Sequence, residues 1–308
     1  MNIENDFKLT SVSGKITQRT ADLAPIDIFL GKWKGRGFNQ IWRPQFGVPN
    51  QDRFLELNET TEVLEFTLIP GEIPNRGLLQ PDINLRGLRY LQQIKDAHAL
   101  GEDGKPAGIH VEPGLWVTVP NTTNPQDPPT VARMGNIPHG TSFVAQGTAL
   151  PDLNGPPPIP PVSITPFLIG KPANLIPFPE STLTNPSQFR TGAQDIPNVT
   201  QVMVDNPNSV LAQAIAGRNI TLTKTLQIST LPLNPPTTGG GTSNIAFLDG
   251  ATGGPNAQAA QMEATFWVET VQMPDGSKRT QLQYSQKVLL NFSGLSWPHV
   301  SVATLLKI

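Results

Sequence analysis

The chain has 308 residues, a formal charge of -2 and an isoelectric point of about 6.1, and charged residues make up only 15% of it. This balance, without a block of like charges, argues against partners bound by phosphate neutralisation, such as nucleic acid or an anionic membrane surface. The lack of cysteine excludes disulfides, thiolate metal sites, iron–sulfur clusters and thiol nucleophiles. Few charges together with 32 prolines and 27 glycines favour strands joined by turns over long exposed helices.

The N-terminal residues 1–24 are expected to form a tail outside the main domain. The segment 1–21 is polar and charged, without the apolar core of a signal peptide. No run elsewhere approaches the roughly 18 apolar residues of a membrane span. We therefore expect no membrane partner, a default cytoplasmic location, and a single domain over residues 25–308.

Strand patterns dominate the chain from residue 31 to residue 147. Alternating apolar and polar residues, bounded by glycine and proline, are the signal used for each strand. The segment 108–119 reads as two short pieces around a turn or bulge at Pro113-Gly114. The other expected strands are 31–38, 54–68, 86–94, 130–134 and 141–147.

The region 150–255 differs in composition and is expected to be a Pro/Gly-rich insertion. Twelve of the prolines fall between residues 151 and 200, so this part is expected to be draped over the surface or to act as a lid. One short helix is predicted at about 207–217, because Asn206-Pro207-Asn208-Ser209 supplies a start signal and Gly217 a stop. Strand character returns over 219–231.

The last fifty residues carry the clearest pattern. Segments 264–271 and 280–290 flank the turn Pro274-Asp275-Gly276 and predict a β-hairpin, and a final strand follows over 297–306. Strands at this spacing predict an all-β fold, an antiparallel up-and-down β-barrel of the calycin type with a long Pro-rich insertion and one short helix. Closing the sheet removes its exposed edges.

Four histidines carry most of the available chemistry, and the common catalytic motifs are absent. There is no His-x-His, His-Glu-x-x-His, Gly-x-Ser-x-Gly or P-loop pattern. His110 and Glu112 share a strand face. They could be two ligands of a metal ion, or they could form an ion pair with each other. His299 shares a face with the small residues Ser301 and Ala303. If that face lines the barrel, His299 is either an interior histidine bonded to backbone or a single axial haem ligand.

Three segments in the same order resemble the nitrobindin family of haem-binding β-barrels. They are Gly31-Lys32-Trp33-Lys34-Gly35-Arg36-Gly37, then Ile109-His110-Val111-Glu112-Pro113-Gly114-Leu115-Trp116, and finally Trp297-Pro298-His299-Val300-Ser301-Val302-Ala303-Thr304-Leu305. The family opens with Gly-x-Trp-x-Gly-x-Gly and ends with a Pro-His-Leu-like strand whose histidine is the proximal iron ligand. Its members are about half as long, so residues 150–250 lie outside the family pattern.

The resemblance implies that His299 binds the iron of a b-type haem. It also implies that Trp33 and the backbone of Gly35 and Gly37 line the first strand of the pocket, and that His110 lies near the barrel interior. The expected function is then reaction of haem with small ligands such as nitric oxide, peroxynitrite or peroxide, with peroxynitrite isomerase or peroxidase-like activity.

The sequence leaves two alternatives open. His139, in the turn between two predicted strands, is a candidate for the distal side of the haem, or else a solvent-facing turn residue. A different function, that of a carrier which holds a lipid-like hydrophobic molecule without chemistry, is also compatible with an apolar barrel. In that case His299 is a polar anchor or a structural hydrogen-bonding group.

Overall fold

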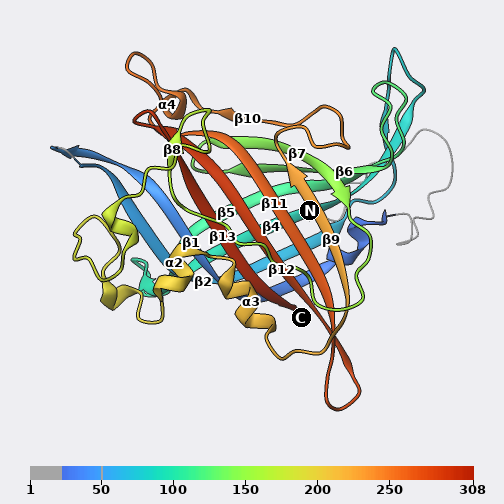
Figure 1. The fold of residues 1–308 in the computed structure, drawn as a ribbon. Coiled ribbons are helices and arrows are strands. Elements are labelled where there is room, and N and C mark those ends of the chain that lie inside the picture. The colour runs from blue at the N-terminus through green and yellow to red at the C-terminus, as the bar shows by residue number, and fades with distance from the viewer. Residues whose placement is uncertain (1–22, 50) are drawn as a thin grey trace.

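The computed structural model describes residues 23–49 and 51–308, and its centre is a ten-stranded antiparallel barrel with the strands in chain order (Figure 1). The barrel closes because the first and last strands pair from Trp33↔Lys307 to Ile41↔His299. This confirms the predicted all-β, up-and-down barrel. Its strands are β1 (Gly31–Val48), β2 (Gln51–Leu68), β4 (Ile83–Leu100), β5 (Pro106–Val119), β6 (Thr130–Ile137), β7 (Thr141–Ala149), β9 (Ile220–Ser229), β11 (Gln258–Gln272), β12 (Lys278–Phe292) and β13 (Leu295–Lys307).

Three short strands lie off this ring. β3 (Ile73–Asn75) pairs with β4, β8 (Phe167–Leu168) pairs with β13, and β10 (Gly241–Asn244) pairs with β7. The four-residue helix α4 (Ala246–Asp249) follows β10 directly.

Several elements differ from the sequence prediction in extent. Residues 108–119 lie in one continuous strand, β5, because its partner β4 pairs across Pro113. Within the region expected to be an insertion, β9 is part of the barrel wall and pairs with β7 and β11. The predicted helix corresponds to α3 (Ser209–Ile215), and the structure adds α2 (Gln201–Asp205) and α4. The expected tail lies outside the described residues except for Leu23 and Ala24.

One end of the barrel interior is filled by an aromatic cluster. The 3-10 helix η2 (Ile26–Phe29) enters the barrel, where Leu23, Ile26 and Phe29 are fully buried. The ring of Phe29 lies 5.1 Å from that of Phe66, 5.0 Å from that of Trp116 and 5.6 Å from that of Phe266. These partners come from β2, β5 and β11, so η2 plugs the barrel across its full width.

A second core lies outside the barrel, under residues 151–216, which we call the coat. Alternation along a strand sends neighbouring side chains to opposite faces, and here both faces are apolar. The outward side chains include those of Phe38, Trp42, Leu55, Leu57, Trp267, Val300 and Val302, packed against Ile164, Ile196, Val204 and Leu211 of the coat. The Pro-rich region is therefore draped over the outer wall of the barrel.

Hydrogen bonds fix the coat to β1 and β2. The backbone N–H of Leu55 donates to the carbonyl of Phe189 at 2.9 Å, and the N–H of Thr191 donates to the carbonyl of Leu55 at 3.1 Å. The indole Nε1 of Trp42 donates to the carbonyl of Ile164 at 2.9 Å. The Arg190 guanidinium donates to four backbone carbonyls of residues 180–185 and so holds a loop of the coat together. In the described part of the chain, no helix has the length and apolar character needed to cross a membrane.

Candidate functional site

The barrel interior opens into a cavity of about 340 Å³ beyond the aromatic cluster. This volume is at the lower end of the range for small-molecule sites. Its walls combine aliphatic side chains with polar and charged ones. The lining residues are Asn39, Ile41, Arg43, Pro44, Glu56, Gln92, Ile94, Ile109, His110, Ile137, His139, Thr141, Leu248, Ala257, Ala259, Tyr284, Gln286, Val288, Leu290, His299 and Ser301.

The structure brings three predicted site residues to this cavity. His299 comes from β13, His110 from β5, and His139 from the turn between β6 and β7. The rings of His110 and His139 lie 6.3 Å apart. In a closed ring of ten strands, β5 and the β6–β7 turn are roughly opposite β13. His299 therefore faces a pair of histidines across the cavity, and the exposed His139 marks the mouth of the cavity.

Trp33, Gly35 and Gly37 are not among the cavity-lining residues. Trp33 is fully buried in the aromatic cluster, where its Nε1 donates to the carbonyl of Phe29 at 2.6 Å. A Cβ atom at Gly35 would lie 2.0 Å from the carbonyl oxygen of Thr304, and one at Gly37 would lie 2.2 Å from that of Val302. The glycines thus serve the close approach of β1 to β13, the seam that closes the barrel.

A chain of hydrogen bonds runs from His299 into the barrel wall. His299 Nε2 lies 2.6 Å from Asn39 Oδ1, which also accepts from the Ser301 hydroxyl at 2.7 Å. Asn39 Nδ2 donates to Asn58 Oδ1 at 3.1 Å, and Asn58 Nδ2 donates to Asp96 Oδ2 at 2.7 Å. These contacts were not predicted, because they depend on the register between four strands, β13, β1, β2 and β4.

The donor-to-acceptor direction of these hydrogen bonds determines which nitrogen of the His299 imidazole carries a hydrogen. The Asp96 carboxylate only accepts, so each amide donates toward it and Asn39 Oδ1 is left to accept. His299 Nε2 must then carry the hydrogen. Burial, with a smaller effect from His110 and His139, lowers the pKa of His299 to about 3. His299 is therefore a neutral imidazole protonated on Nε2 at physiological pH.

Beneath the cavity lies a buried ion pair. Arg133 donates to Glu112 Oε1 at 2.6 Å, and the Tyr90 hydroxyl donates to the same oxygen. Although burial acts in the opposite direction, Arg133 and His110 lower the pKa of Glu112. His110 Nε2 lies 3.4 Å from Glu112 Oε2, within hydrogen-bonding distance of this carboxylate. No group of three or more metal-ligating side chains occurs among the described residues.

A second buried carboxyl, Glu62, lies beside this ion pair. Tyr284 donates its hydroxyl hydrogen to Glu62 Oε2 at 2.7 Å, and Gln92 Nε2 donates to Glu62 Oε1 at 2.9 Å. Burial raises the pKa of Glu62 to about 7, despite these two hydrogen bonds. Sequence reasoning missed this group. The alternation that puts Gln92 on the same face as Leu88 and Tyr90 was the available signal for a polar interior.

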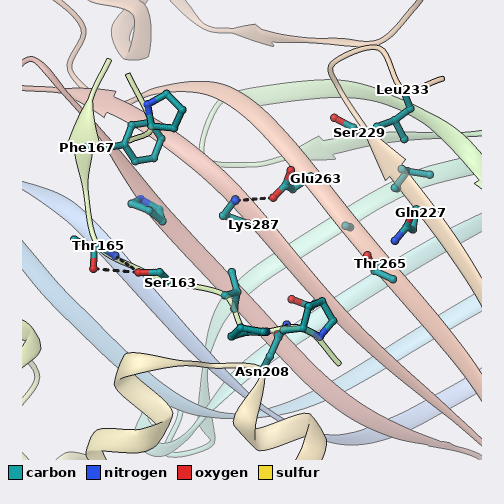
Figure 2. A pocket seen from close by; sticks show the side chains of 18 of the residues that line it. Ser163, Thr165, Phe167, Asn208, Gln227, Ser229, Leu233, Glu263, Thr265 and Lys287 are labelled. Carbon is teal, nitrogen blue, oxygen red and sulfur yellow. Dashed lines mark hydrogen bonds and ion pairs between the residues drawn. The ribbon is translucent and has the colours of Figure 1, made fainter. Parts of the chain in front are cut away.

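A larger hollow of about 510 Å³ lies on the outer wall, between the coat and β9, β11 and β12 (Figure 2). Its two charged lining residues, Glu263 and Lys287, form an ion pair at 2.6 Å. The hydroxyl groups of Ser163 and Thr165 are hydrogen-bonded to each other at 3.0 Å. Because none of the four histidines lines this hollow, the interior cavity is the better candidate for chemistry.

No known protein family matches the sequence, and no curated protein matches it. Among solved structures, the crystal structure of Rv2717c from M. tuberculosis is similar at 16% sequence identity and a TM-score of 0.40. The alignment covers 93% of this chain and 99% of that chain.

Proposed function

We propose that the barrel cavity binds one b-type haem through His299. The observation that carries the proposal is a neutral imidazole in the cavity wall that faces His110 and His139 across the cavity. A haem protein needs one axial ligand from the chain, whereas a zinc site needs three or four. The histidines of this cavity therefore suit haem better than a bare metal ion.

The donor chemistry of the cavity fits haem in two respects. Iron is ligated by the neutral form of histidine, and burial keeps His299 in that form. Aliphatic residues such as Ile41, Ile94 and Val288 give the cavity walls that suit a flat apolar macrocycle. One adjustment is required before Nε2 can ligate: its hydrogen must pass to Nδ1, and its hydrogen bond to Asn39 must break.

Haem held by one histidine supplies an open iron position that acts as a Lewis acid and redox centre toward nitric oxide, peroxynitrite or peroxide. The chain contributes the axial ligand, the apolar walls and the polar groups opposite His299. His110, held near Glu112, and His139 at the mouth are positioned to donate a hydrogen bond to a small ligand or to move a proton.

Visible absorption during a hemin titration tests the proposal. The parent protein should bind hemin saturably at one equivalent, with a Soret band that is lost or shifted in His299→Ala. His98→Ala is the matched control, because His98 lies outside the cavity and contacts Glu59 at 2.6 Å. Absence of saturable binding, or an unchanged spectrum in His299→Ala, would contradict the proposal.

A carrier function is the second candidate, and one contact favours it. His299 Nε2 is already bonded to Asn39 Oδ1 at 2.6 Å, which is the arrangement of a structural histidine. The cavity volume of about 340 Å³ is also sufficient for a compact lipid-like molecule. Under this function His299→Ala should leave the displacement of an environment-sensitive dye by medium-chain lipids nearly unchanged.

A further inference from the structure

The floor of the cavity contains polar groups that the haem proposal does not use. Tyr284, Gln92 and Gln286 border the cavity, and each is at least nine-tenths buried. Arg133 lies behind them and donates to Gln286 Oε1 at 2.8 Å and to Gln92 Oε1 at 3.2 Å. Both amide oxygens are therefore occupied as acceptors, and both amide nitrogens are oriented elsewhere.

The amide nitrogens of Gln92 and Gln286 differ in their hydrogen-bond partners. Gln92 Nε2 donates to Glu62 and, at 3.1 Å, to the Tyr284 hydroxyl. Gln286 Nε2 has no hydrogen-bond partner in the part of the chain that the structure describes. Because Gln286 lines the cavity, its N–H is a donor available to a bound molecule.

The Tyr284 hydroxyl is the second donor of the floor, but its hydrogen is engaged. It donates to Glu62 Oε2 at 2.7 Å when that carboxyl is ionised. When Glu62 takes up a proton, the new carboxyl O–H donates to the Tyr284 oxygen, and the Tyr284 hydrogen is released toward the cavity. Burial holds the pKa of Tyr284 well above its usual value, so the phenol keeps its own proton throughout.

We propose that Tyr284 and Gln286 form a binding subsite for a carbonyl oxygen, and that Glu62 takes up one proton from solvent when the subsite is filled. The ligand class is a compact apolar molecule with one carbonyl group. A neutral oxygen is favoured because Arg133, the cation beneath the cavity, is already paired with Glu112. The proposal rests on the cavity being a ligand site, and it holds for haem-free protein.

The surroundings of Glu62 leave few other groups to take the proton. The charged and titratable side chains that act on it are Tyr284 from β12, Arg133 from β6 and His110 from β5. Glu112 and Tyr90 complete the cluster, and both are bonded to Arg133. On the remaining side, β1 places Gly35 directly opposite Glu62 in the sheet. The raised pKa of Glu62, about 7, agrees with a proton exchange near neutral pH.

Binding of N,N-dimethyloctanamide to the haem-free protein tests the proposal, since this probe has one carbonyl and no donor or titratable group. Calorimetry should give a dissociation constant about tenfold higher at pH 8 than at pH 6, because the binding-competent, protonated form falls by that factor. Titrations in two buffers of different ionisation enthalpy at pH 8 should report uptake of nearly one proton.

Two variants and one control make the test specific. Glu62→Gln imitates the protonated carboxyl, so it should bind the probe at pH 8 as tightly as the parent does at pH 6, without proton uptake. Tyr284→Phe should bind it weakly at every pH. Glu269→Gln is the matched control, because burial also raises the pKa of Glu269 to about 7 but this residue does not line the cavity. It should keep the pH dependence of the parent.

The outcomes separate this inference from the haem proposal. Probe binding that is absent or independent of pH in the parent, or proton uptake that persists in Glu62→Gln, would overturn the subsite even if hemin binds through His299. Proton-coupled probe binding together with no saturable hemin binding would support the subsite and leave the carrier function in place of haem.

Discussion

At the scale of single residues, the proposed haem site centres on His299, and Asn39 determines which nitrogen of its imidazole carries the hydrogen. The chain from Asp96 through Asn58 to Asn39 fixes the hydrogen on His299 Nε2, the atom that would ligate iron. In the proposed haem complex, ligation would therefore compete with a partly buried hydrogen bond. The net contribution of a hydrogen bond of this kind to stability is about 1 kcal/mol.

Asn39→Ala is expected to tighten hemin binding by up to about tenfold, because it frees Nε2 from its acceptor. A hemin titration followed at the Soret band measures the change. Ser301→Ala is the control, since it removes the other donor to Asn39 Oδ1 and leaves the His299 bond in place. Equal or weaker hemin binding in Asn39→Ala would show that the bond does not compete with ligation.

The residues of the cavity were predictable only where alternation along one strand decides the outcome. His299 and Ser301 share the inward face and Val300 and Val302 the outward face, as expected from the sequence. The role of Asn39 depends on its register with β2 and β13, and Glu62 becomes a cavity group only through Tyr284, which is more than two hundred residues away in the chain. Spacing within a strand carries no signal for such contacts.

At the scale of elements, the coat turns the outer wall of the barrel into a second core. Trp42 lies at its centre, with its ring 5.5 Å from Trp297 and 5.8 Å from Phe178. Apolar residues on both faces of β1 and β13 were the sequence signal that another segment covers the outer wall of the barrel. The Pro-rich segment itself has no periodicity from which its packing can be derived, so a lid and a draped segment were equally compatible with the sequence.

Trp42→Ala is expected to destabilise the protein by about 3 to 5 kcal/mol, the usual cost of removing a buried large aromatic side chain. Trp42→Phe, which loses only part of the ring and the bond to Ile164, should cost less. Urea unfolding measures both. Hemin affinity should stay unchanged, because Trp42 packs outside the barrel. A Trp42→Ala protein as stable as the parent would contradict an outer core.

At the scale of the whole molecule, buried titratable groups give the stability a defined pH dependence. Glu62 and Glu269 have folded pKa values of about 7 against an ordinary 4.5. Their stabilising effect is full below pH 4.5 and is lost as pH rises through 7, on the order of 3 kcal/mol each. His299 acts in the opposite direction: its folded pKa of about 3 makes stability fall as pH drops below 6.5. Stability should therefore be greatest in mildly acidic solution.

Glu269→Gln isolates one of these contributions. Glu269 is fully buried, and its Oε1 has no hydrogen-bond partner within the described residues. Since glutamine imitates the protonated carboxyl, the variant should match the parent at pH 4 and exceed its free energy of unfolding by up to about 3 kcal/mol at pH 8. Urea unfolding at the two pH values checks this, and an equal difference at both would refute a buried ionisation.

The measurement that tests the central claim most directly is rescue of the iron ligand in His299→Gly. This variant leaves a space where the imidazole stood, and one equivalent of hemin is added with and without free imidazole. We expect a perturbed Soret band without imidazole and restoration of the parent spectrum as imidazole is added. A parent-like spectrum without imidazole would contradict ligation of haem by His299.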